Sequence, residues 1–289
     1  MTKRAPKLGA DGLEAGDRIS TRFALLRKKK RPGLVTFITA NDPAPDLFRE
    51  ILEGLPSAGA DVIEIGIPFS DPMADGPAIQ MSSQRALKHG TRVRDVLAAV
   101  KSFREAEIDT PVVLMGYYNP IYHYGVQEFA EHAAAAGVDG VIVVDLPPEE
   151  ADELTVHLRA NNMHMIFLTA PTSPDQRLPT IFEKASGFVY YVSITGITGT
   201  ATADELAVKA AVERLRGHTD LPVAVGFGIK TPEQARAIAA HCDAVVVGSA
   251  IVDIIAKGIG KEGAVDRHLS VKVLEFVKSL ASAVHGVWP

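Results

Sequence analysis

The chain has 289 residues, of which 47% are hydrophobic and 22% charged, and its formal net charge is -5 at pH 7. This composition excludes an intrinsically disordered chain, and it lacks the positive surplus expected of a nucleic-acid-binding protein. No apolar run is long enough to span a membrane, and the single cysteine, Cys242, cannot form an internal disulfide, so a cytoplasmic location is expected.

The first 18 residues carry charges but no apolar signal-peptide core. Acidic residues in this stretch, Asp11, Glu14 and Asp17, also disfavour an organellar transit peptide. We expect residues 1–18 to be a mobile extension and residues 19–289 to be one catalytic domain.

Short β-branched runs alternate with longer helical patterns from residue 34 onward, which indicates repeated βα units. Eight runs are predicted to be strands: Leu34–Thr39, Asp61–Gly66, Pro111–Gly116, Gly140–Val144, Met163–Thr169, Phe188–Val192, Pro222–Gly226 and Ala244–Val247. Eight parallel strands can close on themselves with side chains filling the interior. The sequence therefore predicts an α/β fold, a single-domain (β/α)₈ TIM barrel with extra helices.

The segments between the runs carry helix signals. Ser173–Gln176 and Thr231–Gln234 each place a capping hydroxyl before a proline at the first helical position. Two further helical stretches, Ala86–Glu107 and Val265–Val284, are expected as additions to the minimal barrel. The basic run Arg27–Arg31 is predicted to be a solvated face before the first strand.

Glu64 interrupts an otherwise apolar strand, Val62-Ile63-Glu64-Ile65. A buried carboxylate is costly unless it is paired, or its pKa rises until the group is partly neutral. A carboxyl near its own pKa can both donate and accept a proton. Glu64 is therefore a candidate catalytic acid and base, and a buried ion pair with lysine or arginine is the alternative.

A second carboxylate, Asp75, lies eleven residues later in the loop Gly66–Pro77. Three prolines and two glycines make this loop stiff and rich in turns, so it could hold Asp75 over the barrel mouth. Asp71 competes for the same role. Because Asp-Pro and Asp-Gly are also ordinary turn dipeptides, a structural role for either aspartate stays open.

Glycines follow three consecutive predicted strands, in Thr195–Gly199, Gly226–Ile229 and Gly248–Ile251. Phosphate-binding barrels often use the loops after strands 7 and 8, where free backbone N–H groups and a helix N-terminus attract an anion. These loops predict a phosphate site, and Thr195–Gly199 is suited to a lid.

The nine histidines show no His-Glu-x-x-His or other paired spacing, so no metal site is predicted. No strand interior carries the lysine of a Schiff-base aldolase. Tyr117 and Tyr190 could supply hydroxyl groups to a substrate pocket, and a core or turn role is the alternative for each.

The segment Glu64–Pro77 resembles the signature loop of tryptophan synthase α subunits, and the order of the other motifs agrees from about residue 22 to residue 285. The supporting motifs are Phe37–Ala40, Tyr117–Pro120, Asp145–Pro147, Thr195–Gly199, Gly226–Ile229 and Gly248–Ile251. The resemblance implies retro-aldol cleavage of indole-3-glycerol phosphate to indole and glyceraldehyde 3-phosphate in tryptophan biosynthesis. It implies no cofactor on this chain and an α₂β₂ assembly, in which indole passes through a tunnel to a β subunit that carries pyridoxal phosphate.

By position, Glu64 resembles the family's general acid and base, and Asp75 the carboxylate that holds the indole N–H. Phe37 matches the family's substrate-contacting phenylalanine, and Tyr190 its active-site tyrosine. The positions that match the family's phosphate site are Gly199, Gly228, Gly248 and Ser249, and we add Tyr117 to the predicted pocket.

Two positions depart from the family pattern. Asn41 stands where glycine is usual, which is tolerable because asparagine also adopts left-handed turns. Ile194 occupies a lid position that is arginine in some relatives. Two alternative functions remain, another phosphosugar barrel enzyme and an idle barrel that activates a partner protein. The pair Glu64 and Asp75 favours the lyase over both.

Overall fold

The computed structural model describes residues 17–193, 201–226, 228–260 and 264–287. Within these residues, nine parallel strands form one sheet in the order β5-β4-β3-β2-β1-β9-β8-β7-β6. The strands are β1 (Gly33–Thr39), β2 (Val62–Gly66), β3 (Val112–Gly116), β4 (Gly140–Val143), β5 (His164–Met165), β6 (Leu168–Thr169), β7 (Val189–Val192), β8 (Val223–Gly226) and β9 (Ala244–Val247).

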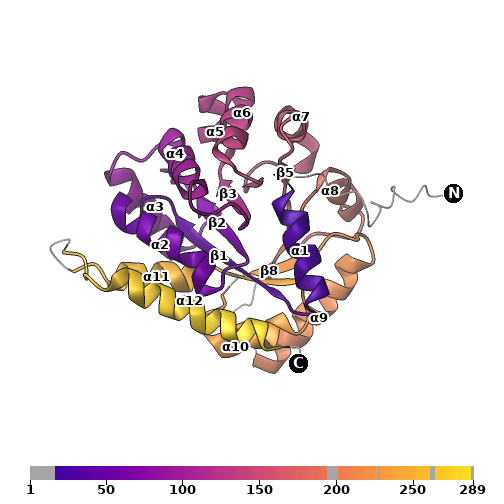
Figure 1. Cartoon of the computed structure of the whole chain (residues 1–289). Helices are drawn as coiled ribbons and strands as arrows, with labels where there is room; N and C mark the ends of the chain where they lie inside the picture. Colours follow the sequence, from indigo (N-terminus) through magenta and orange to yellow (C-terminus); the bar gives the residue numbers. More distant parts are fainter. Residues whose placement is uncertain (1–16, 194–200, 227, 261–263, 288–289) are drawn as a thin grey trace.

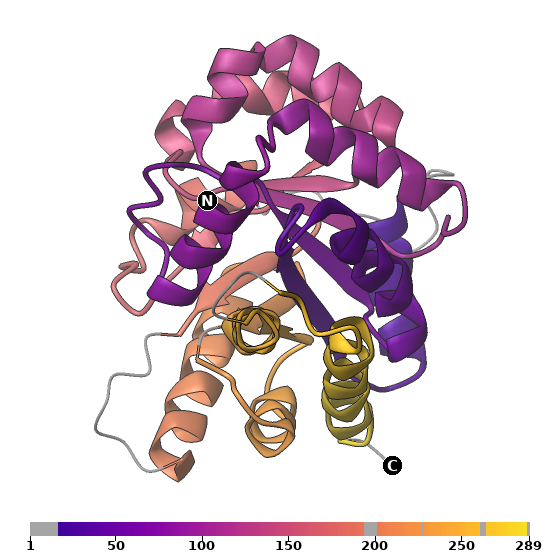
Figure 2. The same ribbon diagram turned by 90° about the vertical axis from the view of Figure 1, so that its left-hand side faces the viewer.

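Helices surround the strands, as Figure 1 shows, and Figure 2 gives the same ring of helices in end view. They are α1 (Arg18–Lys28), α2 (Pro45–Ala58), α3 (Pro77–Lys88), α4 (Val93–Arg104), α5 (Tyr118–Tyr124), α6 (Val126–Ala136), the 3₁₀ helix η1 (Pro148–Glu150), α7 (Asp152–Ala160), α8 (Leu178–Lys184), α9 (Ala201–Arg216), α10 (Pro232–Ala239), α11 (Ser249–Lys257) and α12 (Leu269–His285). Across the part of the chain described, none of these helices combines the length and the apolar character needed to cross a membrane.

The predicted strand Met163–Thr169 is present as two short pieces, β5 and β6. β5 pairs with β4, and β6 pairs with β7, so one continuous segment links the two ends of the sheet. The Ile166 N–H donates to the Val141 carbonyl at 3.0 Å, and the Tyr190 N–H donates to the Phe167 carbonyl at 3.2 Å. The strands therefore close into a barrel, and the predicted (β/α)₈ architecture is confirmed.

Alternate residues along the strands face the barrel interior and pack there as one cluster, which contains Val35, Val62, Val113, Ile142, Ile166, Phe188, Ala224, Ala244 and Val246. The remaining strand residues face the helices and form the larger core layer. Phe37 and Glu64 lie two residues beyond Val35 and Val62, and they are register partners on β1 and β2. Both side chains therefore face the interior, near the carboxyl ends of their strands.

Helix α1 covers the end of the barrel where the strands begin. Its apolar residues Ile19, Phe23 and Leu26 belong to the interior cluster, and the rings of Phe23 and Phe188 lie 5.6 Å apart. The Asp17 side chain caps the helix by accepting the Ser20 N–H at 2.9 Å. Asp17 and Arg18, which the sequence analysis assigned to the extension, are thus part of this folded helix.

Three aspartates immediately before strands share one arrangement at the same end of the barrel. Asp61, Asp139 and Asp243 each accept a backbone N–H from the start of a neighbouring strand, at 2.7–3.0 Å. Each also accepts a hydrogen bond from an arginine; the pairs are Arg31–Asp61, Arg104–Asp139 and Arg216–Asp243. These charge-assisted bonds fix the strand register and give this face a stabilising role.

Of the four helix predictions, two were wrong and two were confirmed; the stretch Val265–Val284 is confirmed as α12, which begins at Leu269. Ser173 does not cap a helix, because its hydroxyl accepts the Ala170 N–H at 3.1 Å and α8 begins only at Leu178. The stretch Ala86–Glu107 is interrupted between α3 and α4, where Gly90 has a φ of +73°. Thr231 caps α10 as predicted, since its hydroxyl accepts the Gln234 N–H at 3.3 Å.

Candidate active site

Glu64 on β2 is buried, with 1% of its surface exposed. Its Oε1 atom has no hydrogen-bond partner among the described residues, and no basic side chain contributes to its pKa. Burial raises the pKa of Glu64 to about 8, and the negative charge of Asp75 adds to the rise. The ion-pair alternative is therefore wrong, and the carboxyl is mainly protonated at neutral pH.

Asp75 lies in the loop between β2 and α3 and is half-buried. Its N–H donates to the Pro72 carbonyl at 3.1 Å, and its carbonyl accepts a hydrogen bond from Gln80 Nε2 at 2.9 Å. Burial raises the pKa of Asp75 to about 6, and a hydrogen bond from Tyr117 limits this rise. The Tyr117 hydroxyl also accepts a hydrogen bond from the Ala74 N–H at 2.9 Å. This tyrosine therefore holds two consecutive loop residues, Ala74 and Asp75.

A narrow pocket lies at the carboxyl ends of β1 to β4, and its walls include Phe37, Thr39, Gly66, Ile67, Asp75, Ile79, Ser83, Met115, Gly116, Tyr117 and Val144. Gly66, which lines this pocket, lies two residues beyond Glu64 on the same face of β2. Asp71, the competing aspartate, is exposed and accepts a hydrogen bond from Ser70. Asp75 is thus the aspartate that contributes to the pocket.

Sequence reasoning missed several pocket residues, among them Met115, Val144 and Ser83. Met115 lies two residues after Val113, an interior residue of the same strand, so the alternation along β3 could have identified it. Ser83 projects from α3, and no local pattern distinguishes it from the other serines of the chain.

The ring of Phe37 lies against two glycines. A Cβ atom on Gly66 would approach Phe37 Cζ to 2.6 Å, and one on Gly248 would approach Phe37 Cβ to 3.2 Å. Glycine at these two positions therefore makes room for the phenylalanine at the inner end of the pocket. The predicted position of Phe37 beside the site is consistent with this packing.

Tyr190 on β7 lies across the barrel against the end of β8. A Cβ atom on Gly226 would approach Tyr190 Oη to 2.5 Å, so the hydroxyl occupies the space that a larger residue would take. Burial raises the pKa of Tyr190 well above 10, with a contribution from the charge of Glu64. Tyr190 is therefore a neutral phenol whose hydroxyl can donate a hydrogen bond.

The adjacent strands β8 and β9 both end in glycine-containing turns. Gly228 has a left-handed φ of +73°, and Gly248 directly precedes α11. No side chain caps the N-terminus of α11, which begins at Ser249. The first backbone N–H groups of a helix have no partner within that helix, so this end can hold an anion.

Two of the predicted features lie outside the described residues: Gly199 and Ile194 of the predicted lid. Asn41 lies within them and has a φ of +60°, as predicted for an asparagine that replaces glycine. Its side-chain amide donates to the Thr91 hydroxyl at 3.1 Å, which ties this turn to the segment before α4.

The sequence matches the family model described as tryptophan synthase alpha chain over residues 23–284. The chain is similar to the solved tryptophan synthase subunit alpha from Legionella pneumophila str. Paris, with 39% identity and a TM-score of 0.86; the match covers 93% of this chain and 99% of that one. It is also similar to tryptophan synthase from M. tuberculosis in an open form, with 33% identity, a TM-score of 0.82, and coverage of 93% and 99%. The chain therefore belongs to the tryptophan synthase alpha chain family, the carbon–carbon lyases that cleave indole-3-glycerol phosphate in tryptophan biosynthesis.

Proposed function

We propose that this chain cleaves indole-3-glycerol phosphate with Glu64 as general acid and base and with Asp75 as the carboxylate that holds the indole N–H. One observation carries the assignment. The pKa of Glu64 is raised to about 8 and that of Asp75 to about 6, so at pH 7 the first group is mainly protonated and the second mainly ionised. Two neighbouring carboxyls thus have opposite protonation states, as acid–base chemistry requires.

In the first step, Glu64 donates its proton to C3 of the indole ring, because indole leaves poorly as a carbanion. Protonation converts the ring to an indolenine and places positive charge on the ring nitrogen. The Asp75 carboxylate accepts the hydrogen bond from that N–H and stabilises the charge as it develops. This role requires an ionised Asp75, in agreement with its pKa of about 6.

In the second step, the Glu64 carboxylate removes the proton from the hydroxyl on the carbon next to C3. The oxygen electrons form the aldehyde carbonyl, the carbon–carbon bond breaks, and its electron pair returns to the ring to give indole. The other product is glyceraldehyde 3-phosphate. Glu64 regains the proton that it donated, so the cycle needs no external acid, base or cofactor on this chain.

The remaining predicted residues position the substrate. We propose that Phe37, Tyr117 and Tyr190 surround the indole ring and the reacting carbons. The phosphate is proposed to bind the backbone N–H groups at Gly228, Gly248 and Ser249, with Gly199 completing the site. The uncapped N-terminus of α11 supports the phosphate assignment.

We further propose a cytoplasmic α₂β₂ assembly, in which indole passes through a tunnel to a β subunit that carries pyridoxal phosphate. The relatives from M. tuberculosis are named as tryptophan synthase, which supports a β-subunit partner. Large apolar side chains on the loop and helix beside the pocket support a docking face as well, since Met73 is 80% and Met81 52% exposed.

The test is to incubate the purified chain with indole-3-glycerol phosphate and to measure indole, alone and with a β subunit. Glu64→Gln is expected to lower kcat by about 10²- to 10⁴-fold while substrate still binds. Asp75→Asn is expected to lower kcat by about 10²-fold or more, because the charge on the ring nitrogen loses its partner. Asp71→Asn is the matched control on the same loop, and its kcat is expected to stay within about twofold of wild type. An unchanged kcat for Glu64→Gln would remove Glu64 from the mechanism.

A further inference from the structure

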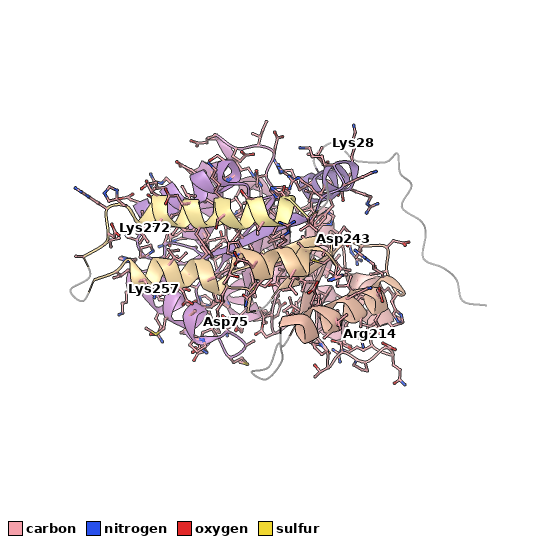
Figure 3. All side chains as sticks on the ribbon, turned by 90° about the horizontal axis from the view of Figure 1, so that it is seen from below. Lys28, Asp75, Arg214, Asp243, Lys257 and Lys272 are labelled. Atoms are coloured by element: carbon pink, nitrogen blue, oxygen red, sulfur yellow. The ribbon has the colours of Figure 1, made fainter. Side chains whose placement is uncertain are left out.

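A second hollow lies at the opposite end of the barrel from the active site. It has a volume of about 290 Å³ and opens between α1 and the segments that lead into β8 and β9. Figure 3 shows Asp243, which lines the hollow, nearer the side of the molecule where Lys28 of α1 lies, and Asp75 apart from it. The hollow is about as large as the smaller pockets that hold organic ligands, and the proposed lyase chemistry does not use it.

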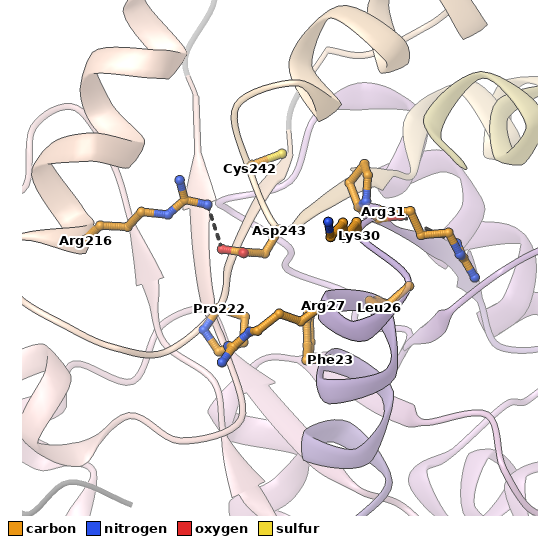
Figure 4. A pocket seen from close by; sticks show the side chains of 10 residues that line it. Phe23, Leu26, Arg27, Lys30, Arg31, Arg216, Pro222, Cys242 and Asp243 are labelled. Carbon is orange, nitrogen blue, oxygen red and sulfur yellow. Dashed lines mark hydrogen bonds and ion pairs between the residues drawn. The ribbon is translucent and has the colours of Figure 1, made fainter. Parts of the chain in front are cut away.

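Four cationic side chains line this hollow, and Asp243 is the one carboxylate among its lining residues. Arg27 comes from α1, Lys30 and Arg31 follow that helix, and Arg216 comes from the end of α9. Figure 4 shows Arg27, Lys30 and Arg216 around Asp243, with the Arg216–Asp243 ion pair dashed. The lining therefore carries a clear positive surplus that arises from segments far apart in the sequence.

The negative charge of Asp243 is already neutralised. Its carboxylate accepts the Val223 N–H at 2.9 Å and a hydrogen bond from Arg216 at 3.1 Å, in the arrangement that fixes strand register. Arg31 is similarly held by Asp61, at 2.8 Å. No ion pair among the described residues engages Arg27 or Lys30, so these two cations are available to an anion in the hollow.

Helix-dipole complementarity does not explain the cluster. Basic residues in the last turn of a helix are favourable, which accounts for Arg27. Lys30 lies beyond the helix, however, and its backbone has a left-handed φ of 49°, which glycine or asparagine adopts more readily than lysine does. The chain therefore places a cation at a position where its backbone favours a different residue.

The floor of the hollow is apolar. Phe23, Leu26 and Cys242 contribute to it and are 5%, 2% and 7% exposed. Burial raises the pKa of the Cys242 thiol, and the thiol donates to the Ala244 carbonyl at 3.1 Å, so it forms an uncharged wall. An apolar floor below a cationic rim fits a ligand with a compact apolar body and a doubly charged anionic group.

We propose that this hollow binds a small organic phosphate, with its phosphate at Arg27 and Lys30 and its apolar body against Phe23, Leu26 and Cys242. The guanidinium group matches phosphate in a forked geometry, and the ammonium adds a point charge. Because the hollow is at the far end of the barrel from Glu64, we expect ligand binding in the hollow and turnover at Glu64 to be independent of each other.

Phenyl phosphate is a suitable probe, with inorganic phosphate and phenol as its two halves. Calorimetric titration of the full chain is expected to give the tightest binding for phenyl phosphate. The double variant Arg27→Ala/Lys30→Ala is expected to raise its Kd about tenfold or more. Lys28→Ala/Lys29→Ala removes the same charge from neighbouring exposed positions that do not line the hollow, and its Kd is expected to change less than about twofold.

Amide NMR shifts locate the bound probe and separate this site from the barrel mouth. Shifts centred on residues near Arg27 and Cys242 support the proposal, and both double variants are expected to retain the wild-type kcat for indole release. Equal Kd values for the two double variants overturn it, as do shifts confined to Gly228 and Gly248. If inorganic phosphate binds as tightly as phenyl phosphate, the proposed role of the apolar floor is refuted.

Discussion

Replacement of Glu64 by glutamine is expected to make the stability of the protein less dependent on pH, in addition to lowering kcat. The folded protein favours the neutral acid, because burial moves the pKa of Glu64 from 4.5 to about 8. In the unfolded chain the group ionises near its ordinary value. Stability is therefore lost as the pH rises between these two values, since the unfolded state releases a proton that the folded state retains.

The size of the effect follows from linkage. Relative to a neutral side chain, the ionisable Glu64 costs about 1 kcal/mol of unfolding free energy at pH 5 and about 3 kcal/mol at pH 7. Glutamine has a similar size and no charge to desolvate. The free energy of unfolding of Glu64→Gln, minus that of wild type, is thus expected to increase by about 2 kcal/mol from pH 5 to pH 7.

Urea unfolding followed by far-ultraviolet circular dichroism at the two pH values measures this difference. Asp71→Asn serves as the control, because the exposed Asp71 side chain has little desolvation to relieve, and its difference from wild type is expected to stay within about 0.5 kcal/mol. Parallel pH dependences for wild type and Glu64→Gln would refute the reasoning, and with it the argument that Glu64 carries a proton at neutral pH.

Three further predictions follow from the same geometry. The pH profile of kcat/KM is expected to be bell-shaped. Activity should rise near pH 6 as Asp75 ionises and fall near pH 8 as Glu64 loses its proton. A flat profile from about pH 5 to 9 would contradict both roles. Tyr117→Phe removes a hydrogen bond that stabilises the Asp75 carboxylate, so the acid limb is expected to move to higher pH and kcat to fall about tenfold; an unmoved limb would exclude this positioning role. Gly226→Ala places a Cβ atom 2.5 Å from Tyr190 Oη, so the free energy of unfolding measured in urea is expected to fall by about 1–3 kcal/mol. An unchanged free energy of unfolding would mean that the tyrosine side chain can move away.

Much of the barrel could be predicted from the sequence, because each buried strand is a short β-branched run between helical patterns. The sequence-based predictions failed where the same residues are compatible with two different local structures. Ser173 has the residues of a helix cap, but its hydroxyl is used in a turn with Ala170, and only the three-dimensional structure distinguishes the two. The split of Met163–Thr169 into β5 and β6 arises because each end pairs with a different neighbour, which is a non-local property.

The candidate site could be located in the sequence for a related reason. A charged residue in an apolar strand is conspicuous, so Glu64 could be identified from its position, whereas the choice between Asp71 and Asp75 required the burial of the loop. The family match sets aside another phosphosugar enzyme as the alternative. The cationic hollow could not be predicted, because the run Arg27–Arg31 has the pattern of a solvated face and Arg216 is distant in sequence.

The closure of one barrel end by α1 has a consequence for the order in which the protein folds. Phe23 is synthesised well before its aromatic partner Phe188, and β1 must also wait for its partner strand β9. Until then, the apolar face of α1 has no final binding surface and is open to chaperones or to misassociation. Pairing of the first and last strands makes the contacts strongly non-local, so we expect slow folding in which docking of this N-terminal helix accompanies the final closure.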